Sequence, residues 1–367
     1  MTKPIKILYA ASTKSHLDRF HRPYIQSLKK YGEVALMATG EDVDFPILFD
    51  KHFFSISNLK SIQKIRKILK EESFDLILVH TTLAAFLIRM ALKGLKKRPY
   101  VINVVHGYLF QEDLQGLKAK ILLLCEKLVR KQTDDIVVMN QEDWRIANKH
   151  GLCQRRVFGV SGMGIPDAFS TPAPDAELRG RFISSEGDCL CTFVGELSNR
   201  KNQAFLIQAV KRLREKRMPV RLCLVGDGEN KERLEEEIRT LGLQDSVFLA
   251  GSTSCVGDYL AITDIYVSAS ISEGLPFNIM EAMAYGLPIV ASDVKGQSDL
   301  LEGVPQGLYP LNDMEAFCQS VAEICNSRRW GVHSVEYPNL AQDRLSAVFG
   351  SVMRIYMRGV KANDADN

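Results

Sequence analysis

Ser272-Glu273-Gly274-Leu275-Pro276-Phe277-Asn278-Ile279-Met280-Glu281-Ala282-Met283-Ala284-Tyr285-Gly286 is the stretch on which the interpretation of the whole chain depends. Apolar runs at residues 265–268 and 288–291 flank it, so a strand, a turn, a short helix and a second strand are predicted in that order. This order is typical of an open parallel α/β sheet. Asn278 is expected to cap the helix, and Gly286 followed by Pro288 to end it.

The chemistry of this stretch points to a phosphate ligand. A helix N-terminus offers unpaired amide groups and the positive end of the helix dipole, and Gly274 allows the backbone to approach a ligand closely. Glu273 precedes the turn and Glu281 lies one turn into the helix, so each carboxylate can accept hydrogen bonds from hydroxyl groups on its own side of a phosphate. A diphosphate between two polyhydroxy groups is a nucleotide sugar.

Glu273 and Glu281, which have seven residues and a Gly-Leu-Pro turn between them, resemble the signature of the family-four retaining glycosyltransferases. The resemblance implies the GT-B fold: two facing, doubly wound α/β domains with a cleft between them and a C-terminal crossover helix. It also implies that Glu273 contacts the donor sugar and that Glu281 binds the ribose. The implied donor-binding set is Glu281, Gly195, Lys201, Arg200, Gly251, Gly274, Leu275, Pro276, Phe277 and Asn278.

We expect an acceptor-side domain at residues 1–166, a linker at 167–187, a nucleotide-sugar domain at 188–338, and a crossover helix and tail at 339–367. The first strand, residues 5–10, is followed by a loop without glycines, so the sequence lacks the fingerprint of an NAD or FAD domain there. A single helix is predicted over residues 17–31. The family resemblance places His16, His21 and Arg22 on the acceptor side, whereas exposed polar side chains are the alternative interpretation.

The strand at residues 100–105 ends in His106-Gly107, at the edge where open α/β sheets bind ligands. This segment resembles the His-Gly-Phe segment of polysaccharide-synthesis members, and the resemblance places His106 near the donor sugar. A loop histidine bonded to nearby backbone is the alternative. Asp42 and Asp44 form an Asp-x-Asp pair in an acidic loop with no nucleotide-binding context. We therefore expect no metal site, and no cofactor beyond the nucleotide sugar as co-substrate.

The loop after the strand at residues 189–194 departs from the family pattern. Lys201 matches the lysine that binds the diphosphate, but Glu196 occupies the position of the usual arginine. Arg200 or Lys295 could replace that arginine. The resemblance implies Glu273, His106 and Lys201 as the catalytic set, and the effect of Glu196 on activity stays open.

Composition limits the possible partners. The chain has 367 residues and a net charge of +3, but residues 1–166 carry 27 basic and 16 acidic side chains, a net charge of +11, against −8 for the remainder. The positive charge lacks interleaved aromatic residues and a recognised nucleic-acid module, so nucleic acid is excluded as a partner. Eight scattered cysteines and the lack of a membrane-spanning apolar run indicate a cytoplasmic protein. The basic, apolar segment 116–131 suits peripheral contact with an anionic membrane.

These observations predict a retaining glycosyltransferase that moves a sugar from a UDP-sugar to a glycan or a lipid-linked acceptor in surface polysaccharide synthesis. Two alternatives stay open. One is a nucleotide-sugar 2-epimerase of related architecture, which has no acceptor. The other is a catalytically inert partner protein, which the Glu196 departure would explain.

Overall fold

The computed structural model describes residues 4–365, except 54, 166–171, 305–306, 328–334, 338–339 and 341–342. The chain forms two compact units: unit 1 contains Met1–Gly164 with Leu345–Asn367, and unit 2 contains Ile165–Arg344. The predicted start of the crossover helix at residue 339 lies outside the described residues. Among the described helices, none is long and apolar enough to cross a membrane.

Unit 1 is built on a parallel sheet with the strand order β3-β2-β1-β4-β5-β6-β7. Most of its strands are continuous apolar runs, as expected where helices cover both faces of a parallel sheet. The strands are β1 (Ile5–Thr13), β2 (Gly32–Thr39), β3 (Phe45–Pro46), β4 (Leu76–His80), β5 (Tyr100–Val105), β6 (Asp135–Val138) and β7 (Arg156–Gly159).

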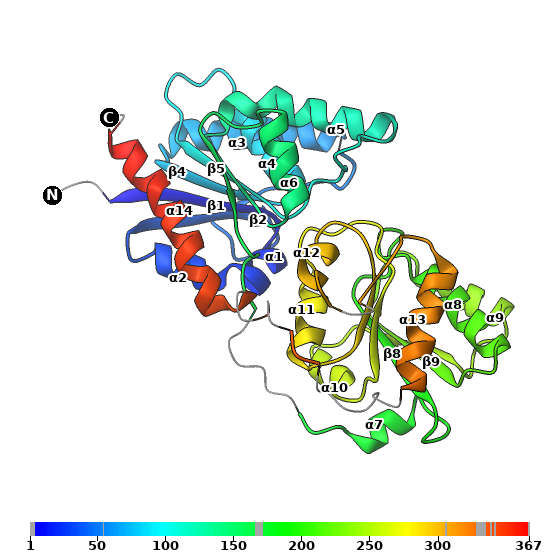
Figure 1. The fold of residues 1–367 in the computed structure, drawn as a ribbon. Coiled ribbons are helices and arrows are strands. Elements are labelled where there is room, and N and C mark those ends of the chain that lie inside the picture. Colours follow the sequence, from blue (N-terminus) through cyan, green and yellow to red (C-terminus); the bar gives the residue numbers. More distant parts are fainter. Residues whose placement is uncertain are drawn as a thin grey trace. The chain divides into compact units, whose positions relative to one another are not determined.

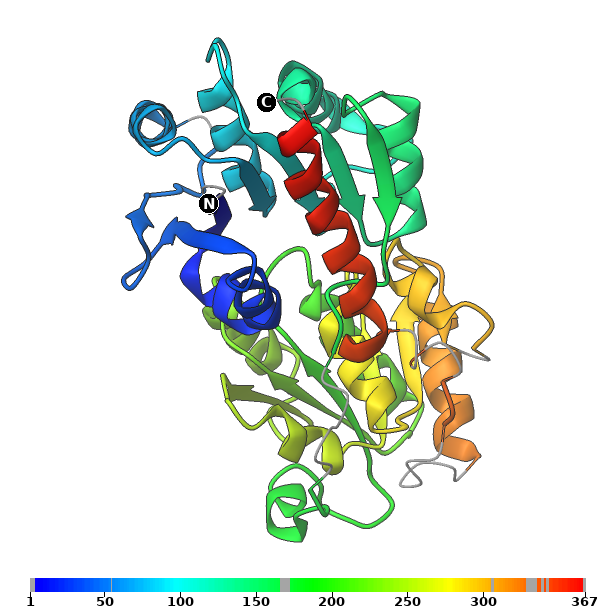
Figure 2. The ribbon, with the colours of Figure 1, turned by 90° about the vertical axis from the view of Figure 1, so that its left-hand side faces the viewer.

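Helices cover this sheet on both faces (Figure 1). They are α1 (Lys14–Phe20), α2 (Arg22–Leu28), α3 (Ile56–Glu71), α4 (Thr82–Leu92), α5 (Gly116–Val129), α6 (Gln141–Lys149) and α14 (Leu345–Ala365). Figure 2 shows α14, in red, running along unit 1. The fit of α14 to β4 and β5 is close, because a Cβ atom added at Gly359 would lie 2.7 Å from a Leu76 methyl and 3.1 Å from an Ile102 methyl.

Unit 2 repeats the design with the strand order β10-β9-β8-β11-β12-β13. Its strands are β8 (Cys189–Val194), β9 (Val220–Val225), β10 (Val247–Gly251), β11 (Ile265–Ser268), β12 (Ile289–Ser292) and β13 (Leu308–Tyr309). Its helices are α7 (Ala176–Gly180), α8 (Gln203–Glu215), α9 (Lys231–Thr240), α10 (Val256–Ala261), α11 (Phe277–Ala284), α12 (Gln297–Leu301) and α13 (Met314–Asn326).

Each sheet reverses its strand order at one point, between β1 and β4 in unit 1 and between β8 and β11 in unit 2. The loops that leave neighbouring strands at such a point go to opposite faces of the sheet, and ligands bind in the crevice outside the carboxyl ends of these strands. The loops after β1, β4, β8 and β11 are therefore the candidate ligand-binding loops of the two units.

Three predicted elements differ from the structure. The helix expected over residues 17–31 is two helices, α1 and α2, that meet at His21. Pro23 explains the break, because its ring clashes with the carbonyl four residues earlier in a continuous helix. Asn278 does not cap α11, since Pro276 occupies the cap position. The predicted linker contains α7, and its described residues belong to unit 2.

A buried ion pair fixes α5 to α4. The two guanidinium NH2 groups of Arg89 donate to the two carboxylate oxygens of Glu126 at 2.9 and 3.0 Å. Arg89 is fully buried and Glu126 is 4% exposed. Arg89 also donates to the Ala85 carbonyl and to the Thr133 hydroxyl, so most of its polar hydrogens have partners. Such a pair fixes geometry more than it adds stability, because desolvation offsets the attraction.

Glu126→Ala should lower the free energy of unfolding of unit 1 by about 3–5 kcal/mol, because it leaves the Arg89 charge buried without a counter-charge. Urea unfolding followed by circular dichroism measures the change. Lys127→Ala is the matched control on the exposed side of the same helix, and its effect should stay within about 0.5 kcal/mol. Equal effects of the two substitutions would contradict the role given to the ion pair.

Candidate active site

Glu273 lies where the loops after β8 and β11 meet in unit 2. One carboxylate oxygen accepts from the Lys201 ammonium at 2.6 Å, and the other accepts from the Arg200 guanidinium at 2.7 Å. Arg200 also donates to the carbonyl of Ser272, and its own carbonyl accepts from the Ile271 amide. The three charged residues that the sequence singled out are thus in direct contact at the reversal point of the sheet.

Burial and charge act in opposite directions on Glu273. Burial by itself would raise the pKa of the Glu273 carboxyl, but Lys201 and Arg200 more than offset it and bring this pKa below its ordinary value. Burial lowers the pKa of the Lys201 ammonium, which Glu273 opposes. Lys201 is 7% exposed, whereas 44% of the Arg200 side chain is exposed. The arrangement holds one buried and one solvent-facing cation around a single carboxylate.

A buried network of hydroxyl and amide groups supports the chain between β11 and Glu273. The Ser292 hydroxyl donates to the carbonyl of Ser270 at 2.6 Å, and the Gln297 amide donates to the Ser268 hydroxyl at 2.8 Å. All four side chains are fully buried. The sequence analysis missed them. A signal was available, because small polar residues at the ends of two apolar strands are unusual unless they have hydrogen-bond partners.

The start of α11 is tied to β8. The Asn278 side-chain amide donates to the carbonyl of Val194 at 2.7 Å, and its side-chain oxygen accepts from the Ile279 amide. Asn278 therefore positions the helix against the neighbouring strand, which replaces the predicted capping role. Pro276 at the cap position provides no side-chain hydrogen bond to the first turn.

The predicted donor-binding backbone lies around these contacts. Leu275, Phe277 and Glu281 are partly exposed and Pro276 is buried. A Cβ atom at Gly296 would lie 2.5 Å from the Gly274 carbonyl, and one at Gly226 would lie 1.9 Å from the Gly195 carbonyl. Glycine at these two positions lets the loops after β9 and β12 pack against the predicted phosphate turns. The backbone carbonyl of Gly251, at the end of β10, accepts a hydrogen bond from the Gly226 amide.

Glu196 is exposed, and its backbone carbonyl accepts a hydrogen bond from the Gln203 side chain. Lys295 is buried at 5% exposure, in the loop after β12. Arg200 is in direct contact with Glu273. The predicted replacement of the missing arginine by Arg200 stays a prediction about the ligand-bound protein.

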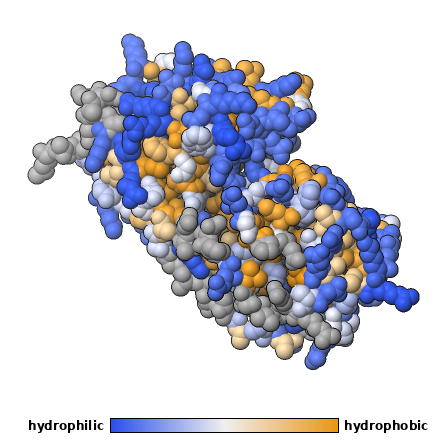
Figure 3. Space-filling view, viewed as in Figure 1, coloured by the Kyte–Doolittle hydropathy of each residue, from blue (hydrophilic) through white to orange (hydrophobic). Residues whose placement is uncertain are grey.

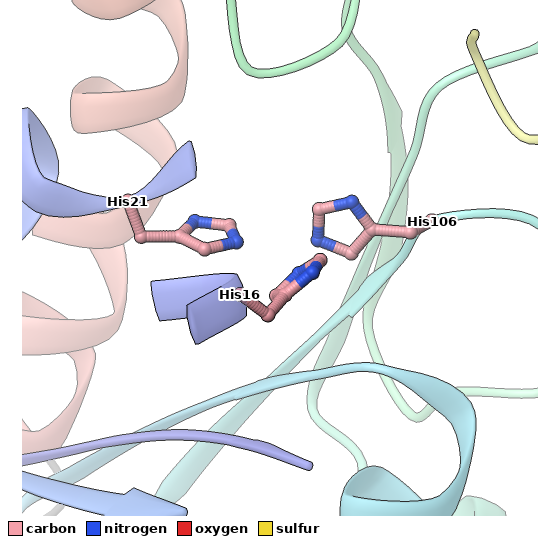
Figure 4. A group of neighbouring side chains, drawn as sticks. All are labelled: His16, His21 and His106. Atoms are coloured by element: carbon pink, nitrogen blue, oxygen red, sulfur yellow. The ribbon is translucent and has the colours of Figure 1, made fainter. Parts of the chain in front are cut away.

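Unit 1 gathers histidines at its own reversal point. His16 lies in α1 after β1, His21 lies between α1 and α2, and His106 follows β5. Figure 4 shows their rings gathered together, with ring nitrogens of His21 and His106 directed toward one another. Ring centroids of His16 lie 5.0 Å from those of His21 and of His106.

His80, the last residue of β4, completes this cluster and was missed by the sequence analysis. Its Nδ1 lies 3.1 Å from Nε2 of His106, and its ring stacks on Tyr9. Tyr9 Oη in turn lies 3.0 Å from Nδ1 of His21. The position of His80 at a strand end was a usable signal, because His106 was identified by the same criterion one strand away.

Burial keeps these imidazoles neutral. It lowers the pKa of His16 to about 4 and that of His106 to about 3. Burial, with the neighbouring rings, also lowers the pKa values of His21 and His80 well below their ordinary value.

Arg22 does not join the cluster. It is 67% exposed at the side chain and lies 3.9 Å from Asp18. Asp44, in the Asp-x-Asp pair, accepts from the Leu36 amide.

Comparisons with known proteins match both units. The family model described as "Glycosyl transferases group 1" matches residues 188–327, and "Glycosyl transferase 4-like" matches residues 6–140. The chain is 28% identical over 339 residues to EpsD of Bacillus subtilis, which carries the name of a glycosyltransferase, and the match covers 88% of each chain. It is 25% identical over 279 residues to an Escherichia coli galactosyltransferase named for UDP-Gal and α-D-GlcNAc-diphosphoundecaprenol, which covers 74% of this chain and 72% of that protein.

Solved structures show the same fold. Sucrose-phosphate synthase from Thermosynechococcus elongatus superposes with a TM-score of 0.78 and 16% identity, and the match covers 97% of this chain and 100% of that one. HepE of Anabaena, solved with UDP and glucose, gives a TM-score of 0.74 at 18% identity and covers 96% and 99%.

The neutral histidines make stability depend on pH. Because the folded pKa values of His16 and His106 lie below the ordinary 6.5, the unfolded chain binds protons first as the pH falls. The free energy of unfolding should therefore decrease below about pH 6.5, until the folded rings protonate near pH 4 and 3. Each ring should contribute up to about 2 kcal/mol of loss between pH 7 and pH 5.

Urea unfolding at pH 7, 6 and 5 measures this loss. His16→Gln should make the pH dependence shallower, whereas His52→Gln should leave it unchanged, because His52 is exposed and outside the cluster. A pH dependence that is the same in wild type and in His16→Gln would contradict the buried, neutral state of the ring.

Proposed function

We propose a donor, an acceptor and a reaction for this chain from one premise: it belongs to the group 1, GT4-like glycosyltransferases, a family of retaining enzymes with the GT-B fold. The proposal is that it transfers a sugar from a UDP-sugar to a lipid-linked acceptor in surface polysaccharide synthesis. The observation that supports it most directly is the contact of Glu273 with Lys201 and Arg200 beside the N-terminus of α11.

The donor diphosphate fits this place on electrostatic grounds. Glu273 compensates one of the two positive charges, so a net positive charge remains beside the start of α11. An anion there gains from the cations and from the positive end of the helix dipole. Glu273 has lone pairs left beyond its two ion pairs and can accept hydrogen bonds from donor-sugar hydroxyls. Glu281, one turn along α11, is assigned to the ribose.

The choice of UDP and of a lipid-linked acceptor is supported by similar proteins. HepE of Anabaena was solved with UDP, and the Escherichia coli relative is named for UDP-Gal and a diphosphoundecaprenol acceptor. The matches to these two proteins cover 96% and 74% of this chain, and each match therefore includes parts of both units. The sugar that this chain transfers is left to experiment.

The proposed reaction proceeds on one face of the sugar. The bond between the anomeric carbon and the diphosphate oxygen breaks, and its electron pair stays on the diphosphate. The acceptor hydroxyl oxygen forms the new bond on the same face, and its proton passes to the leaving phosphate. Lys201 and Arg200 stabilise the charge that develops on the diphosphate. A catalytic part for His106, which lies in the cluster of unit 1, stays a prediction.

The surface of α5 favours a membrane-bound acceptor. Leu117, Ile121, Leu124 and Leu128 form one exposed stripe along the helix, with 74% of Leu117 and 65% of Leu124 accessible. Apolar and polar side chains adjoin one another over the α5 region (Figure 3). Lysines and arginines border the stripe, at Lys118, Lys120, Lys127, Arg130 and Lys131. A helix with this composition lies in a membrane interface, its leucines among the acyl chains and its lysines at anionic headgroups.

The two alternatives are distinguished by product. Incubation with a UDP-sugar and an undecaprenyl-diphosphate-linked sugar should give a lengthened lipid-linked glycan, seen by mass spectrometry. An epimerised free nucleotide sugar would instead favour the 2-epimerase, and tight nucleotide binding without any turnover would favour the inert partner.

Glu281→Ala should weaken binding of a nucleoside diphosphate by roughly ten- to a hundred-fold, because a hydrogen bond to a charged group is lost. Lys201→Ala should weaken it more than Arg200→Ala, since Lys201 is the buried cation. Calorimetry with UDP measures the three affinities, and circular dichroism checks the fold. Lys231→Ala, at the exposed start of α9, is the control and should bind as the wild type does. If Arg200→Ala abolishes transfer while Lys201→Ala does not, the assignment of this loop is wrong.

The membrane surface is tested by co-sedimentation with liposomes of varied anionic lipid content at low and high salt. Each Lys or Arg near an anionic leaflet contributes about 1 kcal/mol, and salt weakens the attraction. Replacing Lys118, Lys120 and Lys127 by Gln, or Leu117 and Leu124 by Ser, should reduce binding strongly. Replacing Lys60, Lys67 and Lys70 on α3 by Gln removes the same charge elsewhere and should have a smaller effect. Binding that ignores lipid charge, or that depends on α3 instead, would rule out the α5 surface.

A further inference from the structure

The histidine cluster of unit 1 has the donor set of a metal site. His16, His21 and His106 each offer one ring nitrogen, and these three nitrogens lie within 4.8 Å of one another. His16 lies in α1, His21 directly follows that helix, and His106 follows β5, and the three rings converge on one point (Figure 4). Four of the seven histidines of the chain are in this cluster when His80 is included.

Two of the ring nitrogens have no hydrogen-bond partner although they are buried. These are Nε2 of His16 and Nε2 of His21. His21 is fully buried, so its nitrogen has lost water without gaining a protein partner. Buried polar atoms of this kind are rare in folded proteins, and an ion is one of the explanations for them.

The surrounding residues can also orient the ligands. Histidines that bind a metal usually donate their other N–H to a nearby oxygen, which fixes the ring and leaves the remaining lone pair for the metal. Tyr9 Oη lies 3.0 Å from Nδ1 of His21 and is placed for that role. His80 Nδ1 lies 3.1 Å from His106 Nε2, so a cation that binds this nitrogen replaces the contact between the two rings.

We propose that His16, His21 and His106 bind a divalent transition-metal ion of the Zn²⁺ class through three imidazole nitrogens. Three neutral nitrogen ligands suit Zn²⁺ and Co²⁺, which commonly take water or an anion as a fourth ligand. Metal–nitrogen distances near 2.1 Å require the nitrogens to be about 3.4 Å apart. Each ring must therefore move inward by less than about 1 Å. The proposal does not depend on the function proposed above.

The test uses the full-length chain without a histidine tag, treated with a chelator and then desalted. Titration with Co²⁺ should give the visible absorption bands of four-coordinate cobalt at one equivalent, and Zn²⁺ should remove them. His16→Ala and His106→Ala should each weaken Co²⁺ affinity by more than about 100-fold. Tyr9→Phe should weaken it by about 10- to 100-fold through loss of the oriented His21 ring.

His52→Ala is the matched control, since His52 is an exposed histidine outside the cluster, and it should leave the titration unchanged. Circular dichroism establishes that each variant is folded. His21→Asn tests the third proposed ligand, and asparagine is used there because it changes the side-chain volume less than alanine does. The proposal is overturned if the wild type binds no Co²⁺ at one equivalent. It is equally overturned if the folded variants of His16, His21 and His106 all bind Co²⁺ as tightly as the wild type, because the site then lies elsewhere.

Discussion

The double ion pair of Glu273 with Lys201 and Arg200 is the interaction on which the proposed donor site depends. It joins the loop after β8 to the loop after β11, the two loops that leave the sheet of unit 2 at its reversal point. A buried carboxylate with two cations adds little to stability, because desolvation consumes most of the attraction. Its position at the carboxyl ends of the strands, next to the start of a helix, is better explained by an anionic ligand.

The two units follow one plan and differ in chemistry. When the strands of each unit are numbered from one, both sheets contain the order 3-2-1-4. In both units the charged or histidine side chains of the candidate site lie near the point where this order reverses. In unit 2 these are a carboxylate and two cations, and the loops around them are brought close by Gly226 and Gly296. In unit 1 they are four neutral histidines and Tyr9. The proposed ligand of unit 2 is therefore an anion, and the proposed ligand of unit 1 is a metal ion held by neutral ring nitrogens.

Most of the longer strands could be predicted from sequence, because continuous apolar runs such as Cys189–Val194 have one interpretation in a parallel sheet. Elements were harder to predict where two local sequence signals favour different structures. Pro23 outweighed the helical pattern of residues 17–31, and Asn278 bonds to the neighbouring strand, which the sequence alone does not reveal. The contact of Arg200 and Lys201 with Glu273 joins residues 72 or more apart, and the sequence analysis did not predict it, because it placed Lys201 on the diphosphate and Glu273 on the donor sugar. The exposure of the α5 leucines also needed the structure, because Leu123 and Leu124 look alike in sequence but only Leu123 is buried.

Hydrogen–deuterium exchange of the whole chain with and without a UDP-sugar tests the central claim most directly, because it reports which backbone amides a bound donor protects. The account predicts slower exchange in residues 195–203 and 272–281, the two loops that Glu273 connects, and in residues 293–296, the loop after β12. Slower exchange confined to the histidine cluster of unit 1, or none in residues 272–281 when the donor is saturating, would contradict it.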